Sequence, residues 1–176
     1  MPTLTPDDTL LGLLAVQPRH GYQLLECFQR ADQLGRLWTM STSQLYAVLK
    51  RLEREAYITG HEVVSDSAPS RTEYHLTPSG QARLQRWLYD TPLSPSIRRI
   101  RVEFLSRLFI AQQLQLPTTD IVRRQREGCE RKHAELLVER TQAVPGIDQL
   151  ALDFQINQLE AVVQWLERCA LLNDSP

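Results

Sequence analysis

The strongest local signal in the sequence is a helix start at Ser41, and a change to β-type periodicity follows closely behind it. Ser41 and Gln44 have the S-x-x-Q spacing of a capping box, in which each side chain satisfies a free backbone amide of the other residue. The apolar residues that recur behind this start at helical spacing are Leu45, Val48, Leu49 and Leu52. The opposite face is small, polar and basic, with Ser43, Gln44, Ala47, Lys50, Arg51 and Arg54. Residues 41–54 are therefore expected to form a helix that packs on one face and exposes the other.

The segment after this helix predicts a β-hairpin. Residues 57–64 are β-prone, residues 65–70 are rich in turn formers, and residues 71–76 alternate polar and apolar side chains. Thr77 and Pro78 then have the residue types of an N-cap and a first helical position, which predicts a further helix.

Two helices are expected before the capping box, over residues 7–16 and 21–34. Each has apolar residues spaced for one buried face. The segment His20-Gly21-Tyr22 is interpreted as shaping the turn between these two helices.

This order of elements is typical of a winged helix-turn-helix. In such folds the third helix enters the major groove of DNA, whose width accepts one α-helix. The third helix here has the required arrangement, with an anchored apolar face and short polar side chains on its first turns. On this interpretation the hairpin is the wing, and Ser67, Ser70 and Arg71 are its candidate phosphate or minor-groove contacts.

A linker is expected at residues 91–96, which contain two prolines and two serines. It would separate a winged helix-turn-helix domain over residues 1–90 from a dimerisation and effector domain over residues 97–176. The helices expected beyond the linker cover residues 96–114, 118–142 and 148–172. The predicted fold class is therefore mainly α with a small antiparallel β-wing and a helical C-terminal domain.

The last of these helices repeats apolar residues in steps of four and three. The residues of this heptad-like seam are Leu152, Ile156, Leu159, Val163 and Leu166. Such a seam is either an internal packing face or a dimer interface. We favour the dimer interface, because three helices alone make a thin domain and a two-fold dimer matches the symmetry of an inverted-repeat site.

The composition excludes several classes of protein. The 176 residues carry a net charge of −1, so the whole chain is not a polyanion binder, although a local basic face remains compatible with this charge. The first residues lack a signal peptide, and no apolar run reaches the roughly 18 residues of a membrane span. The four histidines and three cysteines show no metal-ligand spacing, and neither a nucleophile elbow nor a glycine-rich phosphate loop is present. We therefore expect a cytoplasmic protein that is not an enzyme and uses no cofactor or metal.

Several separated motifs resemble those of the PadR family of transcriptional regulators. They are His20-Gly21-Tyr22-Gln23-Leu24, Leu37-Trp38, STSQLYAVLKRLE over residues 41–53 and RTEYHLTPSG over residues 71–80. The resemblance covers about residues 8–90, and the helical remainder is similar to the larger subgroup of the family in pattern only. It implies a homodimer that represses promoters through inverted-repeat operators, with some members released by phenolic acids or hydrophobic drugs.

The resemblance and the exposed helix face together give the candidate DNA-binding residues. They are Thr42, Ser43, Gln44, Tyr46, Ala47, Lys50 and Arg51 on the helix and Arg71 on the wing. Tyr46 combines an apolar ring with a polar tip, so it is either a core residue or a phosphate donor. The chain departs from the family pattern at Ala56, where a glycine usually closes the helix, so the turn that follows is expected to differ slightly.

The function predicted is that of a dimeric repressor, with double-stranded DNA, a second copy of the chain and a small aromatic or hydrophobic effector as partners. Candidates for the effector cavity are Trp87, Phe104 and Trp165, which are otherwise ordinary core aromatics. Two alternatives remain. One is a winged-helix interaction module without DNA binding, and the other is a small-molecule-binding protein without an operator.

Overall fold

The computed structural model of the chain describes residues 4–65 and 68–173. It divides into two compact units, which are taken separately below. Unit 1 consists of Met1–Thr91 and Leu105–Leu116, and unit 2 consists of Pro92–Phe104 and Pro117–Pro176. No helix in the described parts of the chain combines the length and the apolar character that a bilayer crossing requires.

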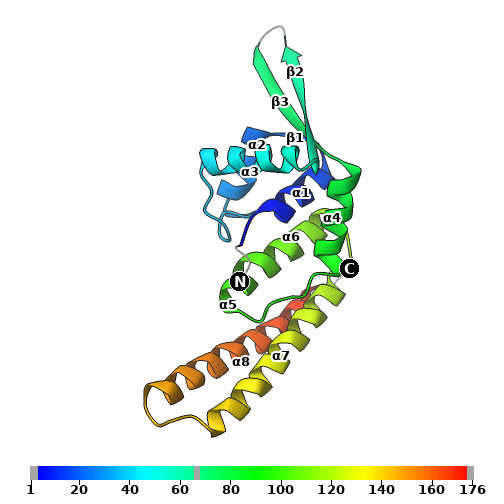
Figure 1. Ribbon diagram of the computed structural model, residues 1–176. Helices are drawn as coiled ribbons and strands as arrows, with labels where there is room; N and C mark the ends of the chain where they lie inside the picture. The colour runs from blue at the N-terminus through cyan, green and yellow to red at the C-terminus, as the bar shows by residue number, and fades with distance from the viewer. Residues whose placement is uncertain (1–3, 66–67, 174–176) are drawn as a thin grey trace. The chain divides into compact units, whose positions relative to one another are not determined.

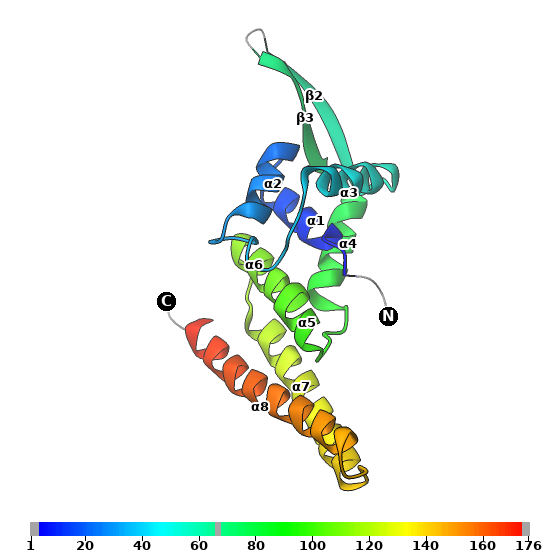
Figure 2. The same ribbon diagram turned by 90° about the vertical axis from the view of Figure 1, so that its left-hand side faces the viewer.

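Unit 1 is a helical body that carries a β-hairpin (Figure 1). Its elements are α1 (Asp7–Val16), β1 (Arg19–His20), α2 (Gly21–Gln29), α3 (Thr42–Arg54), β2 (Ile58–Ser65), β3 (Ala68–Leu76), α4 (Pro78–Tyr89) and α6 (Leu105–Gln113). The described strands form one antiparallel sheet in the order β1-β3-β2. The hairpin of β2 and β3 is the wing, and it projects beyond the helices in both views (Figure 2). The predicted fold class, mainly helical with a small antiparallel wing, is confirmed.

Helix starts were predictable in this unit because their signals are local. The helix α3 begins directly after Ser41, and α4 begins at Pro78 behind the N-cap Thr77, whose Oγ1 accepts a hydrogen bond from the Gly80 amide at 3.1 Å. The end of α2 was predicted less well. The helix stops at Gln29 rather than near residue 34, because the chain turns so that the buried Leu34 donates its amide to the Cys27 carbonyl at 3.0 Å.

A short strand that the sequence did not reveal connects α1 to α2. The strand β1 pairs with β3, with Arg19 opposite Tyr74 and His20 opposite Glu73. Two residues are too few to show a period, so only the partner strand makes β1 recognisable. The pairing fixes the start of α2 against the wing.

The helix α6 packs in unit 1, although the sequence placed residues 97–176 together in a C-terminal domain. A Cβ atom at Gly12 of α1 would overlap the side chain of Ile110, so the two helices approach each other closely. The Trp38 indole also donates a hydrogen bond to the Ser106 hydroxyl at 2.8 Å. These contacts join residues far apart in sequence, and the proline-rich linker gives no sign of them.

The turn after α3 is closed by an alanine in a left-handed conformation. Ala56 has φ of 59°, the Tyr57 amide donates to the Leu52 carbonyl at 2.9 Å, and the Ala56 amide donates to the Glu53 carbonyl at 2.9 Å. This is the hydrogen-bond pattern of a Schellman motif, in which glycine is usual. The left-handed conformation costs an alanine about 1 kcal/mol relative to glycine, and the hydrogen bonds of the motif are nevertheless made.

Unit 2 consists mainly of a helical hairpin. Its elements are α5 (Ile97–Arg99), the π-helix η1 (Ile100–Phe104), α7 (Thr119–Thr141) and α8 (Ile147–Asn173). The long helices α7 and α8 run side by side in opposite directions (Figures 1 and 2). The helix predicted over residues 96–114 is interrupted by the π-turn of η1, for which the sequence offers no signal.

Candidate nucleic-acid interface

The first turn of α3 is held by reciprocal hydrogen bonds. The Gln44 amide donates to the Ser41 hydroxyl at 3.3 Å, and the Ser41 amide donates to the Gln44 side-chain oxygen at 2.9 Å. The predicted capping box is therefore confirmed. It commits the Gln44 oxygen to the helix and leaves the side-chain NH₂ group of Gln44 as the part that can reach a base edge.

The two faces of α3 are separated as the sequence predicted. The buried residues of the helix are Leu45, Val48, Leu49 and Leu52. The predicted DNA-binding residues that are exposed on it are Thr42, Ser43, Gln44, Tyr46, Ala47 and Lys50. Because the apolar face anchors the helix in unit 1, the polar face is available for a groove without any rearrangement of the core.

Arg51, the remaining candidate on α3, has a partner inside the protein. Its guanidinium pairs with the carboxylate of Asp7, which is only 6% exposed, and its own side chain is half-buried. Arg83 also reaches this cluster, at 3.4 Å from Asp7 and 2.8 Å from Asp8. Burial alone would lower the pKa of Arg83, but its hydrogen bond to Asp8 and the charges of Asp8 and Asp7 outweigh burial and raise it. The cluster joins α3 to the start of α1 and the middle of α4, which favours a structural role for Arg51.

Replacing Arg51 by glutamine tests that role. The change leaves the buried Asp7 with a single partner, so we expect the free energy of unfolding to fall by about 1–2 kcal/mol, a value reduced because Arg51 is partly exposed. Binding to DNA should change no more than in the matched control Arg54→Gln, which alters an exposed arginine of the same helix. Urea unfolding and DNA titration of both variants measure the two effects. A large loss of DNA affinity with unchanged stability would make Arg51 a DNA contact instead.

Arg71 lies on β3 of the wing, opposite Val63 of β2. Arg71 is exposed, and its guanidinium carbon lies 5.5 Å from the ring centre of Tyr22 on α2. Ser70 is exposed beside it, whereas Ser67, the third candidate on the wing, lies outside the described residues. The structure thus places the candidate wing arginine next to Tyr22, a residue to which the sequence analysis gave only a role in shaping a turn.

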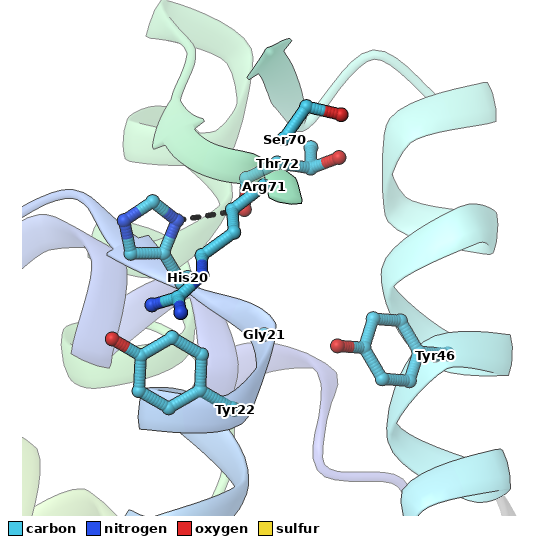
Figure 3. Close-up of a pocket in the computed structure, with 7 residues that line it drawn as sticks. All are labelled: His20, Gly21, Tyr22, Tyr46, Ser70, Arg71 and Thr72. Atoms are coloured by element: carbon cyan, nitrogen blue, oxygen red, sulfur yellow. Dashed lines mark hydrogen bonds between the residues drawn. The ribbon is translucent and has the colours of Figure 1, made fainter. Parts of the chain in front are cut away.

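A recess of about 550 Å³ lies where α2, α3 and β3 meet (Figure 3). Its lining residues are His20, Gly21, Tyr22, Tyr46, Ser70, Arg71 and Thr72. Three of them, Tyr46, Ser70 and Arg71, were candidates from the sequence. The residues of α2 and its N-cap were missed because only the pairing of β1 with β3 brings α2 next to the wing.

The aromatic effector candidates do not form one cluster within a single unit. Trp87 belongs to unit 1 and is 7% exposed. The guanidinium carbon of Arg107 lies 5.1 Å from the centre of the Trp87 ring. Phe104 and Trp165 belong to unit 2 and meet edge to face with ring centres 6.0 Å apart. Their role toward an effector remains a prediction.

The apolar seam of α8 is partly used within one chain. Leu159 and Leu166 are buried in unit 2, whereas Leu152, Ile156 and Val163 are half-buried. The large apolar side chains that unit 2 exposes most lie near the turn of the hairpin, namely Val138, Val144, Ile147, Leu150 and Phe154. The seam as a dimer interface remains a prediction, with internal packing accounting for its two most buried leucines.

The described titratable residues include the possible metal ligands and nucleophiles. In residues 4–65 and 68–173 no group of three His, Cys, Asp or Glu side chains could hold a metal ion. Burial raises the pKa of the Cys129 thiol, which makes this cysteine a poor nucleophile.

Comparisons with known proteins find transcriptional regulators. Residues 10–86 match the transcriptional regulator PadR-like family. A probable transcriptional regulator of Mycobacterium tuberculosis is 32% identical over 87 residues, which are 49% of this chain and 44% of that protein. The negative transcriptional regulator PadR of Bacillus subtilis is 29% identical over 128 residues, 72% of this chain and 68% of its own length. A crystal structure of the Bacillus subtilis protein in complex with operator DNA is similar with a TM-score of 0.49 at 24% identity, covering 98% of this chain and 99% of that one.

Proposed function

The chain belongs to the PadR-like family of transcriptional regulators, and we propose that it is a homodimeric repressor that reads an inverted-repeat operator with α3. Proteins of this family are regulators and not enzymes. We place its action in the cytoplasm, where promoter DNA is accessible.

The observation that carries this proposal is the separation of faces on α3. Four apolar residues anchor the helix, and its exposed side carries short polar groups on the first turns and Lys50 one turn further on. Direct readout in the major groove requires such groups at base edges, because each base pair presents a distinct pattern of donors and acceptors there. Ser43, the Gln44 amide group and Lys50 are therefore assigned to base edges, and Thr42 and Tyr46 to the flanking backbone.

The dimer follows from the symmetry of the target. A two-fold related pair of α3 helices reads two half-sites about 34 Å apart, one turn of DNA, and this geometry requires a palindromic operator. Unit 2 would supply the contact between protomers through the half-buried part of the α8 seam, Leu152, Ile156 and Val163.

An effector that releases the DNA is the third part of the proposal. Phe104 and Trp165 form an edge-to-face pair in unit 2, and an aromatic or hydrophobic molecule would be held by such rings. Trp87 is assigned to the same role.

Binding of the full chain to its own upstream DNA tests the proposal. We expect two chains per operator, with affinity that falls as salt rises because phosphate contacts release counterions. Genome-wide mapping of bound fragments followed by anisotropy titration of the recovered duplexes measures site, stoichiometry and salt dependence. Recovery of no fragment above background would contradict the proposal. A stable complex with another protein in the same extract would then favour the interaction-module alternative.

A further inference from the structure

We propose that the recess between α2, α3 and β3 binds one phosphate group of the DNA backbone, and this inference rests on the proposed function. The recess opens beside the exposed face of α3, to which Tyr46 also belongs (Figure 3). A phosphate on the strand that borders the major groove would occupy this position once α3 has entered the groove. The proposal adds residues of α2 to a DNA contact that the sequence had limited to the helix and the wing.

The cation of the site is held in place by aromatic rings. The Arg71 guanidinium lies 5.5 Å from the Tyr22 ring centre, and the Tyr22 and His20 rings are stacked 5.7 Å apart at an angle of 9°. Tyr22 is half exposed although it is large and aromatic, so burial in the core does not explain its position. An arginine supported in this way loses less conformational freedom on binding, and its planar group matches the oxygens of a phosphate.

Tyr46 supplies a hydrogen-bond donor on the other side of the recess. Its hydroxyl points into the space between α3 and α2 (Figure 3). A Cβ atom at Gly21 would lie only 2.7 Å from that hydroxyl oxygen, so glycine at the start of α2 is what admits the tyrosine. The Gly21 and Tyr22 amides at the start of α2 have no acceptors within the helix and add partial positive charge to the same wall, whereas the Gln23 amide takes part in a capping box with His20.

The wall formed by the wing is fixed before any DNA arrives. The Nδ1 atom of His20 lies 3.1 Å from the Thr72 carbonyl oxygen, and because a carbonyl only accepts, Nδ1 carries the hydrogen. This bond and the pairing of His20 with Glu73 attach β3 to the start of α2. His20 is therefore a positioning residue that keeps Arg71 over Tyr22.

The charge of the lining selects an anion. Among the residues that the structure describes, the lining includes one arginine and neither aspartate nor glutamate. The acidic residue of the strand that follows Thr72 is Glu73, whose carboxylate is hydrogen-bonded to the His75 ring at 2.9 Å. A singly charged phosphodiester fits this charge, and the hydroxyls of Ser70 and Thr72 at the rim offer further hydrogen bonds.

Three substitutions measured by salt-dependent DNA titration test the site. Arg71→Gln should weaken binding about tenfold, equally for operator and unrelated duplexes, and should make the slope of log K against log salt shallower by about 0.9. Tyr46→Phe removes one donor and should weaken binding about fivefold. Tyr22→Ala should weaken binding about threefold, and the double variant with Arg71→Gln should bind no more weakly than Arg71→Gln alone, because Tyr22 acts through that arginine. The matched control Arg168→Gln removes the same charge from an exposed site on α8 and should leave the slope unchanged.

The outcomes separate the site from the function. If the wild-type chain binds its operator and Arg71→Gln and Tyr46→Phe leave affinity and slope unchanged, the recess is not a phosphate site and the proposed function stands. Additive effects of Tyr22→Ala and Arg71→Gln would overturn the role of Tyr22. Inorganic phosphate titrated into the DNA-free protein, followed through the NMR signals of the Arg71 guanidinium, distinguishes the source of the phosphate. Saturation by inorganic phosphate in a chain that binds no DNA would overturn both the DNA-backbone assignment and the proposed function.

Discussion

Replacing Gln44 by glutamate and Lys50 by alanine in one chain is expected to abolish operator recognition while α3 stays folded. Two base-edge contacts worth about 1–3 kcal/mol each are removed, so affinity for the operator should fall about 100-fold or more. Affinity for unrelated DNA should fall as well, because the double change lowers the charge of the helix face by two, but it should fall less than affinity for the operator, since no base contact is lost there. The ratio of the two affinities, measured by fluorescence anisotropy at one salt concentration, is the decisive quantity.

Glutamate is chosen at position 44 because the structure shows what alanine would damage. The Gln44 side-chain oxygen accepts the Ser41 amide at 2.9 Å, and a glutamate oxygen preserves that bond while the NH₂ group is lost. Gln44→Ala would instead lose half of the capping box and about 1 kcal/mol of stability. Helix content and melting temperature of the double variant should therefore stay close to those of the wild type. An unchanged affinity ratio in such a folded variant would show that α3 does not read the operator.

Gly80→Ala is expected to destabilise unit 1 by about 3 kcal/mol or more. A Cβ atom there would overlap the carbonyl oxygen of Tyr57 and would lie 2.7 Å from the Leu76 side chain. This carbonyl is a backbone group that accepts a hydrogen bond from the Thr77 amide at 3.1 Å. It cannot move without breaking that bond, which joins the wing to α4. Urea unfolding followed by circular dichroism measures the loss.

Gly128→Ala is the matched control for that substitution. A Cβ atom at this position of α7 would lie 3.6 Å from the Leu93 carbonyl oxygen, an ordinary contact distance. Alanine is also more favourable than glycine in the interior of a helix, so the free energy of unfolding of this variant should rise by up to about 1 kcal/mol. Equal stability of the two variants would contradict the steric argument at Gly80.

The parts of the fold that the sequence predicted are those with local signals. The start of α3 at Ser41, the start of α4 behind Thr77 and the hairpin between them are all confirmed. Each depends on side chains that act on the backbone within a few residues, so a pattern of three or four letters is sufficient. The buried and exposed faces of α3 also follow from spacing alone.

The parts that were not predicted depend on contacts between distant residues. The ion pair of Arg51 joins two residues that are 44 positions apart in the sequence. The spacing on α3 places Arg51 on the outer face of the helix, but it does not show that Asp7 lies beside it. Tyr22 lies beside Arg71 because the short strand β1 pairs with β3. Leu159 is buried where α8 packs against α7. No window of sequence contains both partners of such a contact.

The capping box at Ser41 and Gln44 limits how relatives of this regulator can diverge toward new operators. A substitution at position 44 other than glutamate would lose the bond to the Ser41 amide, so it is expected to change helix stability together with base preference. Ala47 and Lys50 are exposed and lie beyond the first turn of the helix, whereas the Ser43 hydroxyl is hydrogen-bonded to the Ser41 hydroxyl at 3.1 Å. Libraries made to retarget the protein therefore gain most by randomising positions 47 and 50 and keeping position 44 fixed.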